Sequence, residues 1–256
     1  MYIATQIIKW SAICLVVLSI TIFFLVRPAP DLKSVLSYKK QIQASNSTCI
    51  TSLAGIDVSY YQGKVDWLKV LNENIHFVYL KATDGITYTD PRFHENQNSL
   101  IKSEVAHGAY HFFEPNDDGV KQAKNFLSQI KIHKNMLPPV LDIEITQGVD
   151  KELIKKRAKE WLETVTLELG CKPIIYSYSS YYENNLGSDF LEYPVWIADY
   201  TKKPNLPKGE TQFLIWQHTQ KGDVSGIDTM VDKNWFFGNN CRLNSIKCKQ
   251  EGEKKI

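Results

Sequence analysis

Short apolar runs recur along this chain, and their alternation with helical patterns constrains the fold more than any other feature. Seven runs have the length and composition of buried strands: Gly55–Ser59, Phe77–Thr83, Val105–Phe113, Pro139–Glu144, Pro173–Tyr178, Val195–Tyr200 and Phe213–Thr219. Helical patterns separate most of the early runs, whereas turns separate the late ones. Strand–helix alternation is typical of a parallel sheet, and a periodic region of this length favours a barrel over an open sheet. The sequence therefore predicts an α/β fold, an incomplete (β/α) barrel of the TIM-barrel type whose late strands are joined by turns.

The clearest helical pattern runs from Asp150 to Leu169. Its apolar side chains recur on one face at helical spacing: Leu153, Ile154, Ala158, Trp161, Leu162, Val165 and Leu169. Gly170 follows at the position where a helix end favours glycine. Two shorter helices are predicted over Asn96–Val105 and Gly119–Ile130.

The fourth strand run ends in two carboxylates, Asp142 and Glu144. Side chains on a strand alternate between faces, so both acids point to one side, with Leu141 and Ile143 on the other. Two strand steps separate their Cα atoms by about 6.5–7 Å, and like charges that close raise the pKa of at least one acid. A protonated carboxyl beside an ionised one is the pairing that glycoside hydrolysis uses. The same spacing also suits a strand end whose acids are solvated or paired with Lys or Arg, and the motif alone leaves both interpretations open.

Polar residues mark other strand ends, which is where barrel enzymes place their chemistry. They are Asp57, Tyr110, His111, Asp199, Tyr200, Gln217 and His218. Aromatic residues recur beside them: Tyr60, Tyr61, Tyr110, Phe112, Tyr176, Trp196, Tyr200 and Trp216. Sugar rings present apolar C–H faces and polar edges, so aromatics among carboxylates suit a glycan groove, although any single aromatic also suits the core of a barrel.

Other chemistries fit the sequence less well. His107 and His111 form an H-x-x-x-H pattern, but on a strand they lie about 13 Å apart, too far to share one ion with ligands at about 2.1 Å. No metal or cofactor site is therefore predicted. A net charge of +2, with no basic stripe interleaved with aromatics, argues against nucleic-acid binding. The chain also has no G-x-S-x-G motif and no P-loop.

Taken in order, these motifs resemble the lysozymes of glycoside hydrolase family 25, N-acetylmuramidases that act on peptidoglycan. The similar segments follow in the family's order: Gly55–Gly63, Phe77–Gly85, Gly108–Phe113, Val140–Glu144, Val195–Tyr200, Ile215–Thr219, Gly226–Ile227 and Val231–Phe236. They span Gly55 to Gly238. Each motif is weak by itself, whereas the whole series in order is specific.

The resemblance implies four acids in the active site. Glu144 matches the general acid/base, and Asp142 matches the neighbouring carboxylate, which assists either as nucleophile or by orienting the substrate's 2-acetamido group. Asp57 and Asp232 match the other two acids of the cleft. The implied reaction is retaining hydrolysis of the β-1,4 bond between N-acetylmuramic acid and N-acetylglucosamine, with no metal or other cofactor. The predicted substrate-binding residues are Tyr110, Phe112, Tyr176, Trp196, Asp199, Tyr200 and Gln217. The alternative function is a non-catalytic peptidoglycan-binding module held at the membrane.

The domain organisation begins with a predicted N-terminal transmembrane helix in residues 1–27. Seventeen uncharged residues, 10–26, lie between Lys9 and Arg27, which is near the lower limit for crossing a bilayer, and no small-x-small cleavage site follows them. Residues 28–52 are predicted as a polar linker, 53–240 as the lysozyme-like catalytic barrel, and 241–256 as a polar C-terminal tail. A monomer is expected.

Two arguments disagree about the side of the membrane on which the predicted domain lies. Lys and Arg residues are more numerous after the apolar segment than before it, which favours a cytoplasmic domain. A peptidoglycan substrate instead places the domain on the periplasmic or extracellular side, which is the prediction made here. Four cysteines lie outside the apolar segment: Cys49, Cys171, Cys241 and Cys248. An exported domain would allow two disulfides in one of three pairings, and a cytoplasmic domain would hold four thiols.

Overall fold

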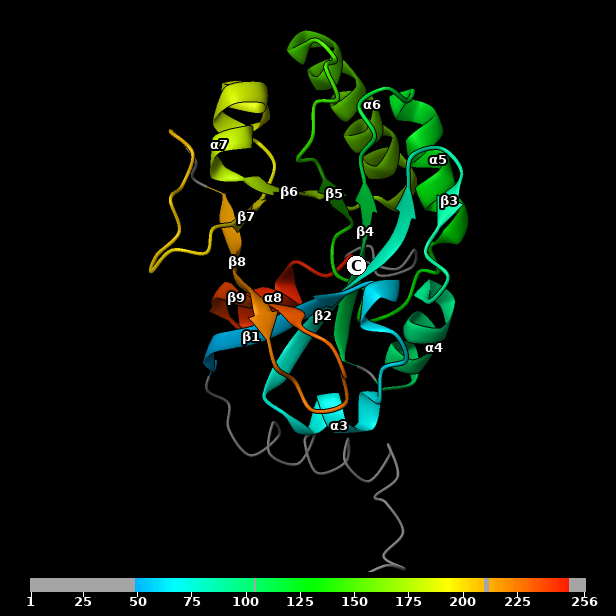
Figure 1. Ribbon diagram of the computed structural model, residues 1–256, viewed down its shortest axis with the longest axis vertical. Coiled ribbons are helices and arrows are strands. Elements are labelled where there is room, and N and C mark those ends of the chain that lie inside the picture. The colour runs from blue at the N-terminus through cyan, green and yellow to red at the C-terminus, as the bar shows by residue number, and fades with distance from the viewer. Residues whose placement is uncertain (1–48, 104, 210–211, 249–256) are drawn as a thin grey trace, which may run out of the picture.

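The computed structural model describes residues 49–103, 105–209 and 212–248 (Figure 1). The predicted transmembrane helix in residues 1–27 lies outside these ranges, and so do residues 28–48 of the predicted linker. Within these ranges, every helix is too short or too polar to cross a bilayer.

Eight strands of the described chain close into a barrel, and hydrogen bonds join each strand to the next. Around the ring they are β1 (Thr51–Val58), β2 (Ile75–Asp84), β4 (Ala106–Phe112), β5 (Val140–Asp142), β6 (Ile174–Tyr178), β7 (Val195–Ala198), β8 (Phe213–Gly222) and β9 (Val231–Asn239). The short strand β3 (Tyr88–Thr89) pairs with β2 outside the ring. Strands β1 to β8 of the ring run parallel, whereas β9 runs antiparallel to both β8 and β1 and closes the barrel between them.

Strand β9 corrects the sequence-based expectation of a wholly parallel sheet. Its motif was recognised, but a strand was not predicted there. The other seven strands of the ring overlap the seven predicted runs, with shifted ends, and the short strand β3 was not predicted. Helices follow the early strands: α3 (Trp67–Asn72), α4 (Phe93–Ser103), α5 (Gly119–Gln129) and α6 (Lys151–Leu169). Helix α4 begins three residues before the predicted start, and α3 was not predicted.

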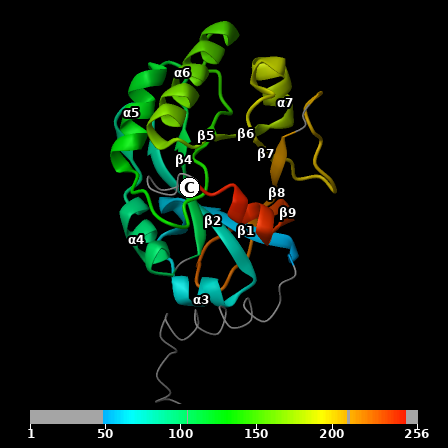
Figure 2. The same cartoon turned by 180° about the vertical axis from the view of Figure 1, so that it is seen from behind.

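Helix α6 agrees closely with its prediction. The side chain of Asp150 caps its first turn by accepting a hydrogen bond from the backbone N–H of Glu152, and Gly170 ends it in the left-handed conformation at φ 59°. Three consecutive short helices, α7 (Ser179–Tyr181), Tyr182–Leu186 and Gly187–Phe190, separate β6 from β7. In the described chain no helix separates β7 from β8 or β8 from β9, so the expectation of late strands joined by turns holds for these two connections and is wrong for the connection from β6 to β7. Figures 1 and 2 show α5 and α6 beside β4 and β5, with β8 and β9 across the barrel from them.

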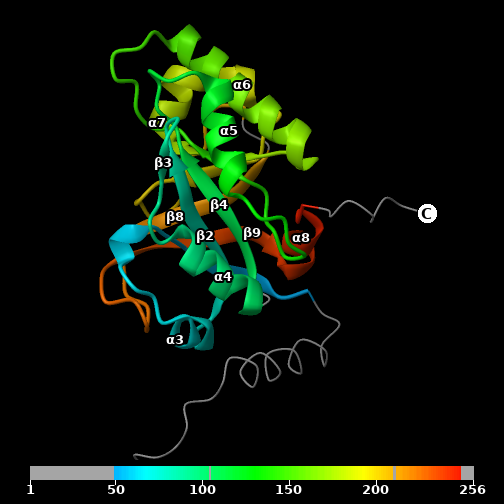
Figure 3. The ribbon, with the colours of Figure 1, turned by 90° about the vertical axis from the view of Figure 1, so that its right-hand side faces the viewer.

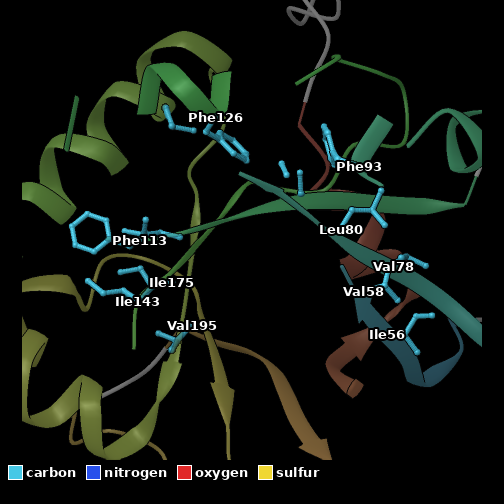
Figure 4. Close-up of a cluster of buried hydrophobic side chains, with 14 of the residues drawn as sticks. Ile56, Val58, Val78, Leu80, Phe93, Phe113, Phe126, Ile143, Ile175 and Val195 are labelled. Atoms are coloured by element: carbon cyan, nitrogen blue, oxygen red, sulfur yellow. The ribbon is translucent and has the colours of Figure 1, made fainter. Parts of the chain in front are cut away.

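Alternation along the strands separates two cores. Outward side chains such as Ile56, Val78 and Leu80 belong to one buried cluster that also contains the helix residues Phe126 and Trp161. Figure 4 shows part of this cluster. Inward side chains fill the barrel: Leu53, Phe77, Tyr79, Ala106, Val140, Ile174, Tyr176, Trp196, Ala198, Ile215 and Phe236. Each burial of a large side chain in these layers contributes on the order of 1.5–3 kcal/mol.

Two glycines make room for the aromatic rings inside the barrel. A Cβ atom at Gly55 would lie 2.4 Å from the ring of Phe77, and one at Gly108 would lie 2.4 Å from the ring of Tyr79. No real Cβ atom approaches a ring that closely, so only glycine fits beside these rings. The two large rings block the barrel interior below the cleft.

Helix α8 (Asn240–Ser245) follows β9 directly, as the red end of the ribbon in Figure 3 shows. Leu243 packs into the inner core. Disulfides join Cys49 to Cys241 and Cys171 to Cys248. The segment 241–248, for which the sequence predicted a polar tail, is therefore fastened to the barrel by a helix and two cross-links.

Candidate active site

The four predicted acids meet at one end of the barrel. Asp57 lies one residue before the end of β1, Asp142 ends β5, and Glu144 follows two residues later. Asp232 lies at the start of β9. Because β9 is antiparallel to its neighbours, its start lies at the same end of the barrel as the carboxyl ends of the parallel strands. All four acids line one cleft of about 270 Å³.

The backbone around Asp142 and Glu144 is held by its neighbouring strands. The carbonyl of Asp142 accepts a hydrogen bond from the N–H of Phe113 at 2.8 Å, and the N–H of Ile143 donates to the carbonyl of Tyr176 at 3.0 Å. The Ser177 hydroxyl donates to the carbonyl of Ile143 at 2.7 Å. Sheet-like bonding thus continues past the end of β5. It keeps both acids on the cleft side, with Ile143 fully buried in the outer core, as the alternation predicted.

Burial governs the protonation of this acid pair. It raises the pKa of Asp142 well above its ordinary value, and the charge of Glu144 adds to that rise. Burial also raises the pKa of Glu144. The ammonium of Lys81 acts in the opposite direction on both carboxyls. Among the described residues, no group bonds to Asp142 Oδ1 or Glu144 Oε2. Both atoms are buried, so neither oxygen has its hydrogen-bonding capacity satisfied by the described chain.

Asp57 and Asp232 form a second carboxyl pair, opposite each other across β1 and β9. Asp57 accepts hydrogen bonds from Asn234 Nδ2 at 2.7 Å and from Gln217 Nε2 at 3.2 Å. The indole N–H of Trp196 donates to Asn234 Oδ1 at 2.9 Å and so orients that amide. Burial and the charge of Asp57 raise the pKa of Asp232 to about 8. Asp232 therefore carries a proton at neutral pH and donates it in a hydrogen bond to Asp57.

Aromatic side chains surround the acids. Six of the seven predicted substrate-binding residues line the cleft: Tyr110, Phe112, Tyr176, Trp196, Tyr200 and Gln217. The hydroxyls of Tyr176 and Tyr200 both donate to Gln217 Oε1, at 3.0 and 2.8 Å. Since Gln217 donates its own amide to Asp57, the tyrosines and the acid pair form one hydrogen-bonded wall.

The seventh predicted residue, Asp199, does not line the cleft. Its carboxylate accepts hydrogen bonds from the backbone N–H groups of Thr201 and Asn205, at 3.0 and 2.9 Å, and so organises the loop after β7. His111 and His218 also lie away from the cleft. His111 is buried against Trp161 in the outer core, and His218 stacks on an outward-facing tryptophan of β9. Each directly precedes or follows an inward-facing residue, and alternation turns it outward.

Tyr61, one of the aromatics that the sequence indicated for a glycan groove, lines the cleft. The cleft also contains residues that the sequence did not indicate: Val58, Ser59, Gln62, Lys81, Val140, Tyr178 and Gln220. Two of them were within reach of the alternation rule. Lys81 is two residues beyond the inward-facing Tyr79, and Tyr178 is two beyond Tyr176. Tyr61 is 69% exposed on the rim, in a short helical turn capped by Ser59. In the described part of the chain, no three His, Cys, Asp or Glu side chains are grouped as metal ligands.

Comparisons with known proteins agree with one another. The sequence model for Glycosyl hydrolases family 25 matches residues 56–227. The chain is 35% identical to the protein YegX of Escherichia coli K12 over 211 residues, covering 80% of this chain and 75% of YegX. It is 31% identical to Lysozyme M1 of Streptomyces globisporus over 210 residues, covering 77% and 71%. The crystal structure of a bacterial lysozyme from Streptomyces coelicolor superimposes with a TM-score of 0.73 at 29% identity, covering 79% of this chain and 98% of that one.

Proposed function

Because the chain belongs to glycosyl hydrolase family 25 and is therefore a glycoside hydrolase, we propose that it is a lysozyme of the muramidase type. The bond it cleaves is the β-1,4 bond between N-acetylmuramic acid and N-acetylglucosamine in peptidoglycan, with retention of configuration. One observation carries the proposal: four carboxyls from β1, β5 and β9 converge in a single cleft walled by aromatic rings. Relatives that are named lysozymes support it.

In the proposed reaction, Glu144 is the general acid/base. Burial raises the pKa of Glu144, which favours its protonated form, and its Oε2 atom has no hydrogen-bond partner among the described residues. Protonation of that oxygen breaks the bond to the leaving sugar. Asp142 stabilises the charge that develops on the remaining sugar, either by attacking it as a nucleophile or by orienting the 2-acetamido group that does so. Glu144 then removes a proton from the water that completes hydrolysis.

The second acid pair and the aromatic wall bind the substrate in this proposal. Protonated Asp232 and the amide of Gln217 hold Asp57 in place, and the three groups present polar atoms to sugar hydroxyls. Phe112 and Trp196 offer apolar surface to the C–H faces of the rings. This combination of polar edge and flat apolar face suits a glycan strand better than an extended peptide.

The products of digestion test the proposal. Peptidoglycan sacculi are incubated with the purified full chain, the new reducing ends are reduced with borohydride, and the fragments are identified by mass spectrometry. A muramidase yields reduced N-acetylmuramic acid at the new ends. Reduced N-acetylglucosamine at those ends would mean that the other glycosidic bond is cut. Binding to sacculi without soluble fragments would instead favour the non-catalytic alternative.

A matched pair of variants tests the role of Glu144. Glu144→Gln removes the proton donor, and we expect activity to fall by about 10²–10⁴-fold with little change in melting temperature. Glu163→Gln makes the same chemical change on the exposed side of α6 and should leave activity intact. Equal activity in the two variants would refute the assignment of Glu144.

We further propose that the domain is anchored by residues 10–26 and works on the periplasmic or extracellular side. The two disulfides support that side, because such bonds form and persist in oxidising compartments. They oppose the count of Lys and Arg, which favours the cytoplasm. A topology reporter fused after Ile256 distinguishes the two sides. Activity of a reporter that works only in the cytoplasm would exclude peptidoglycan as the substrate.

A further inference from the structure

Lys81 places a positive charge beside the carboxyls of the cleft. Among the described residues that line the cleft it is the only cation. It lies on β2 and points inward, and only 13% of its side chain is exposed. Its ammonium lies 2.9 Å from Asp84 Oδ2 and 4.9 Å from the centre of the Phe112 ring. Burying an amine costs free energy unless it is paired, and Asp84 supplies that pairing. The inward direction of the side chain also places its positive charge in the cleft that the four acids line.

We propose that Lys81 is a positioning residue of the hydrolysis reaction, and that its charge keeps Asp142 and Glu144 in the state that shares a single proton. The inference deepens the proposed function and rests on it. A lysozyme-type step needs one protonated and one ionised carboxyl at the same time. Burial favours the neutral form of both acids. A fixed positive charge nearby restores the ionised form of one of them.

The other charged and titratable groups around the pair cannot take this role. They are Asp57 on β1, Asp84 on β2, Tyr88 on β3, Tyr110 on β4, Tyr176 and Tyr178 on β6, Tyr181 on α7, Tyr200 after β7, and Asp232 on β9. Each of these tyrosines has a pKa raised above its ordinary value and is therefore uncharged at neutral pH. An ionised carboxyl opposes a further negative charge in the cleft, so among the described groups that line it only Lys81 supplies a positive charge that favours one.

A series of hydrogen-bonded side chains connects the ammonium of Lys81 to the loop that follows Glu144. Asp84 pairs with Lys81 and also shares a hydrogen bond with Glu114. Gln147 Nε2 donates to Glu114 Oε2 at 2.6 Å, and Asn116 Nδ2 donates to Gln147 Oε1 at 2.6 Å. Gln147 has a positive φ of 47°. Residues other than glycine rarely adopt this backbone conformation, and here the two side-chain hydrogen bonds of Gln147 help to hold it. The network thus ties Lys81, through β2 and the loop after β4, to the loop after β5.

The pH dependence of kcat on peptidoglycan tests this role with the full chain in detergent. In Lys81→Met, loss of the positive charge raises the pKa of both acids, so both limbs of the bell-shaped profile should move to higher pH. A displacement of about one pH unit is expected, the low end of what a nearby opposite charge produces. Lys81→Arg keeps the charge and should restore the wild-type limbs. Asp84→Asn should move the profile the other way, because the charge of Asp84 raises the pKa of Asp142.

A purely structural role predicts a different result. Loss of packing alone would lower the melting temperature and reduce kcat by the same factor at every pH, so the limbs of the profile would not move. That outcome in Lys81→Met would overturn the proposal. Lys121→Met, on the exposed side of α5, is the matched control and should leave the profile unchanged.

A second measurement separates failure of this inference from failure of the proposed function. NMR titration of ¹³C-labelled carboxyl groups reports the protonation of Asp142 and Glu144 whether or not the chain cuts peptidoglycan. Titration midpoints that rise in Lys81→Met and return in Lys81→Arg support the inference. Midpoints that are the same in wild type and Lys81→Met refute it. A wild-type chain that releases no muropeptides refutes the proposed function instead.

Discussion

The two disulfides predict a large and unequal loss of stability on their removal. The bond between Cys49 and Cys241 spans 192 residues of sequence, and the bond between Cys171 and Cys248 spans 77. In the chain-entropy description, closing loops of these lengths removes unfolded-state entropy worth about 5 and about 4.5 kcal/mol respectively. Native strain and residual structure in the unfolded chain reduce such values, so we expect losses of about 3–5 kcal/mol in the free energy of unfolding.

The measurement is thermal unfolding of the full chain, followed by near-ultraviolet circular dichroism under non-reducing conditions. At about 2–4 °C per kcal/mol for a domain of this size, the Cys49→Ser/Cys241→Ser double variant should melt about 10 °C below the wild type. Adding a reductant should abolish the difference, because the wild type then loses the same cross-link. A double variant that melts within 2 °C of the oxidised wild type would refute the reasoning, as would mass-spectrometric identification of a different cysteine pairing.

Three further predictions concern packing and protonation. Gly108→Ala forces a methyl group against the ring of Tyr79 and should cost about 1–3 kcal/mol in unfolding free energy, measured by urea denaturation; an unchanged midpoint would contradict the close approach. The pKa of Asp232 is raised to about 8 in the folded protein, so the stability that its protonated form contributes is lost as pH rises from about 4 to 8. At pH 8, Asp232→Asn should therefore have a free energy of unfolding about 1–2 kcal/mol higher than the wild type, after allowance for partial exposure, and should lose activity. An unchanged melting temperature at that pH would exclude the raised pKa. Burial lowers the pKa of His111 to about 3, so folding stability should fall as pH drops from 6.5 towards 3, and His111→Gln should flatten that dependence in urea titrations at successive pH values.

The position of the segment Val140–Glu144 was predictable because strand alternation is a strong constraint. Leu141 and Ile143 had to face the helices, and this places Asp142 and Glu144 on the cleft side. The same rule reaches Lys81, which continues the inward series of Phe77 and Tyr79. It was missed because a lysine is usually placed at the surface, where its charge is solvated.

Other features depend on tertiary structure that no local pattern encodes. Strand β9 has an unusual pattern because its inward face is polar at the cleft, with Asp232 and Asn234, while its outward face carries Trp235 and Phe237. A prediction from the alternation of polar and apolar residues would therefore assign the outward face of β9 to the core and its inward face to solvent. Asp199 directly follows the end of β7, but its carboxylate accepts hydrogen bonds from the backbone of its own loop and does not line the cleft. The pairing of Cys49 with Cys241 and of Cys171 with Cys248 depends on which distant segments the fold brings side by side.

The closure of the barrel by β9 sets the order in which this hydrolase becomes complete. Asp57 lies on the first strand of the ring and its partner Asp232 on the last. A nascent chain that has emerged only as far as β8 already contains Asp142 and Glu144, yet it has two open strand edges, on β1 and β8, and lacks one wall of the cleft. The cleft therefore gains its fourth acid, Asp232, and the ring of strands closes only when β9 is in place. A chain that lacks β9 has three of the four acids and two unpaired strand edges.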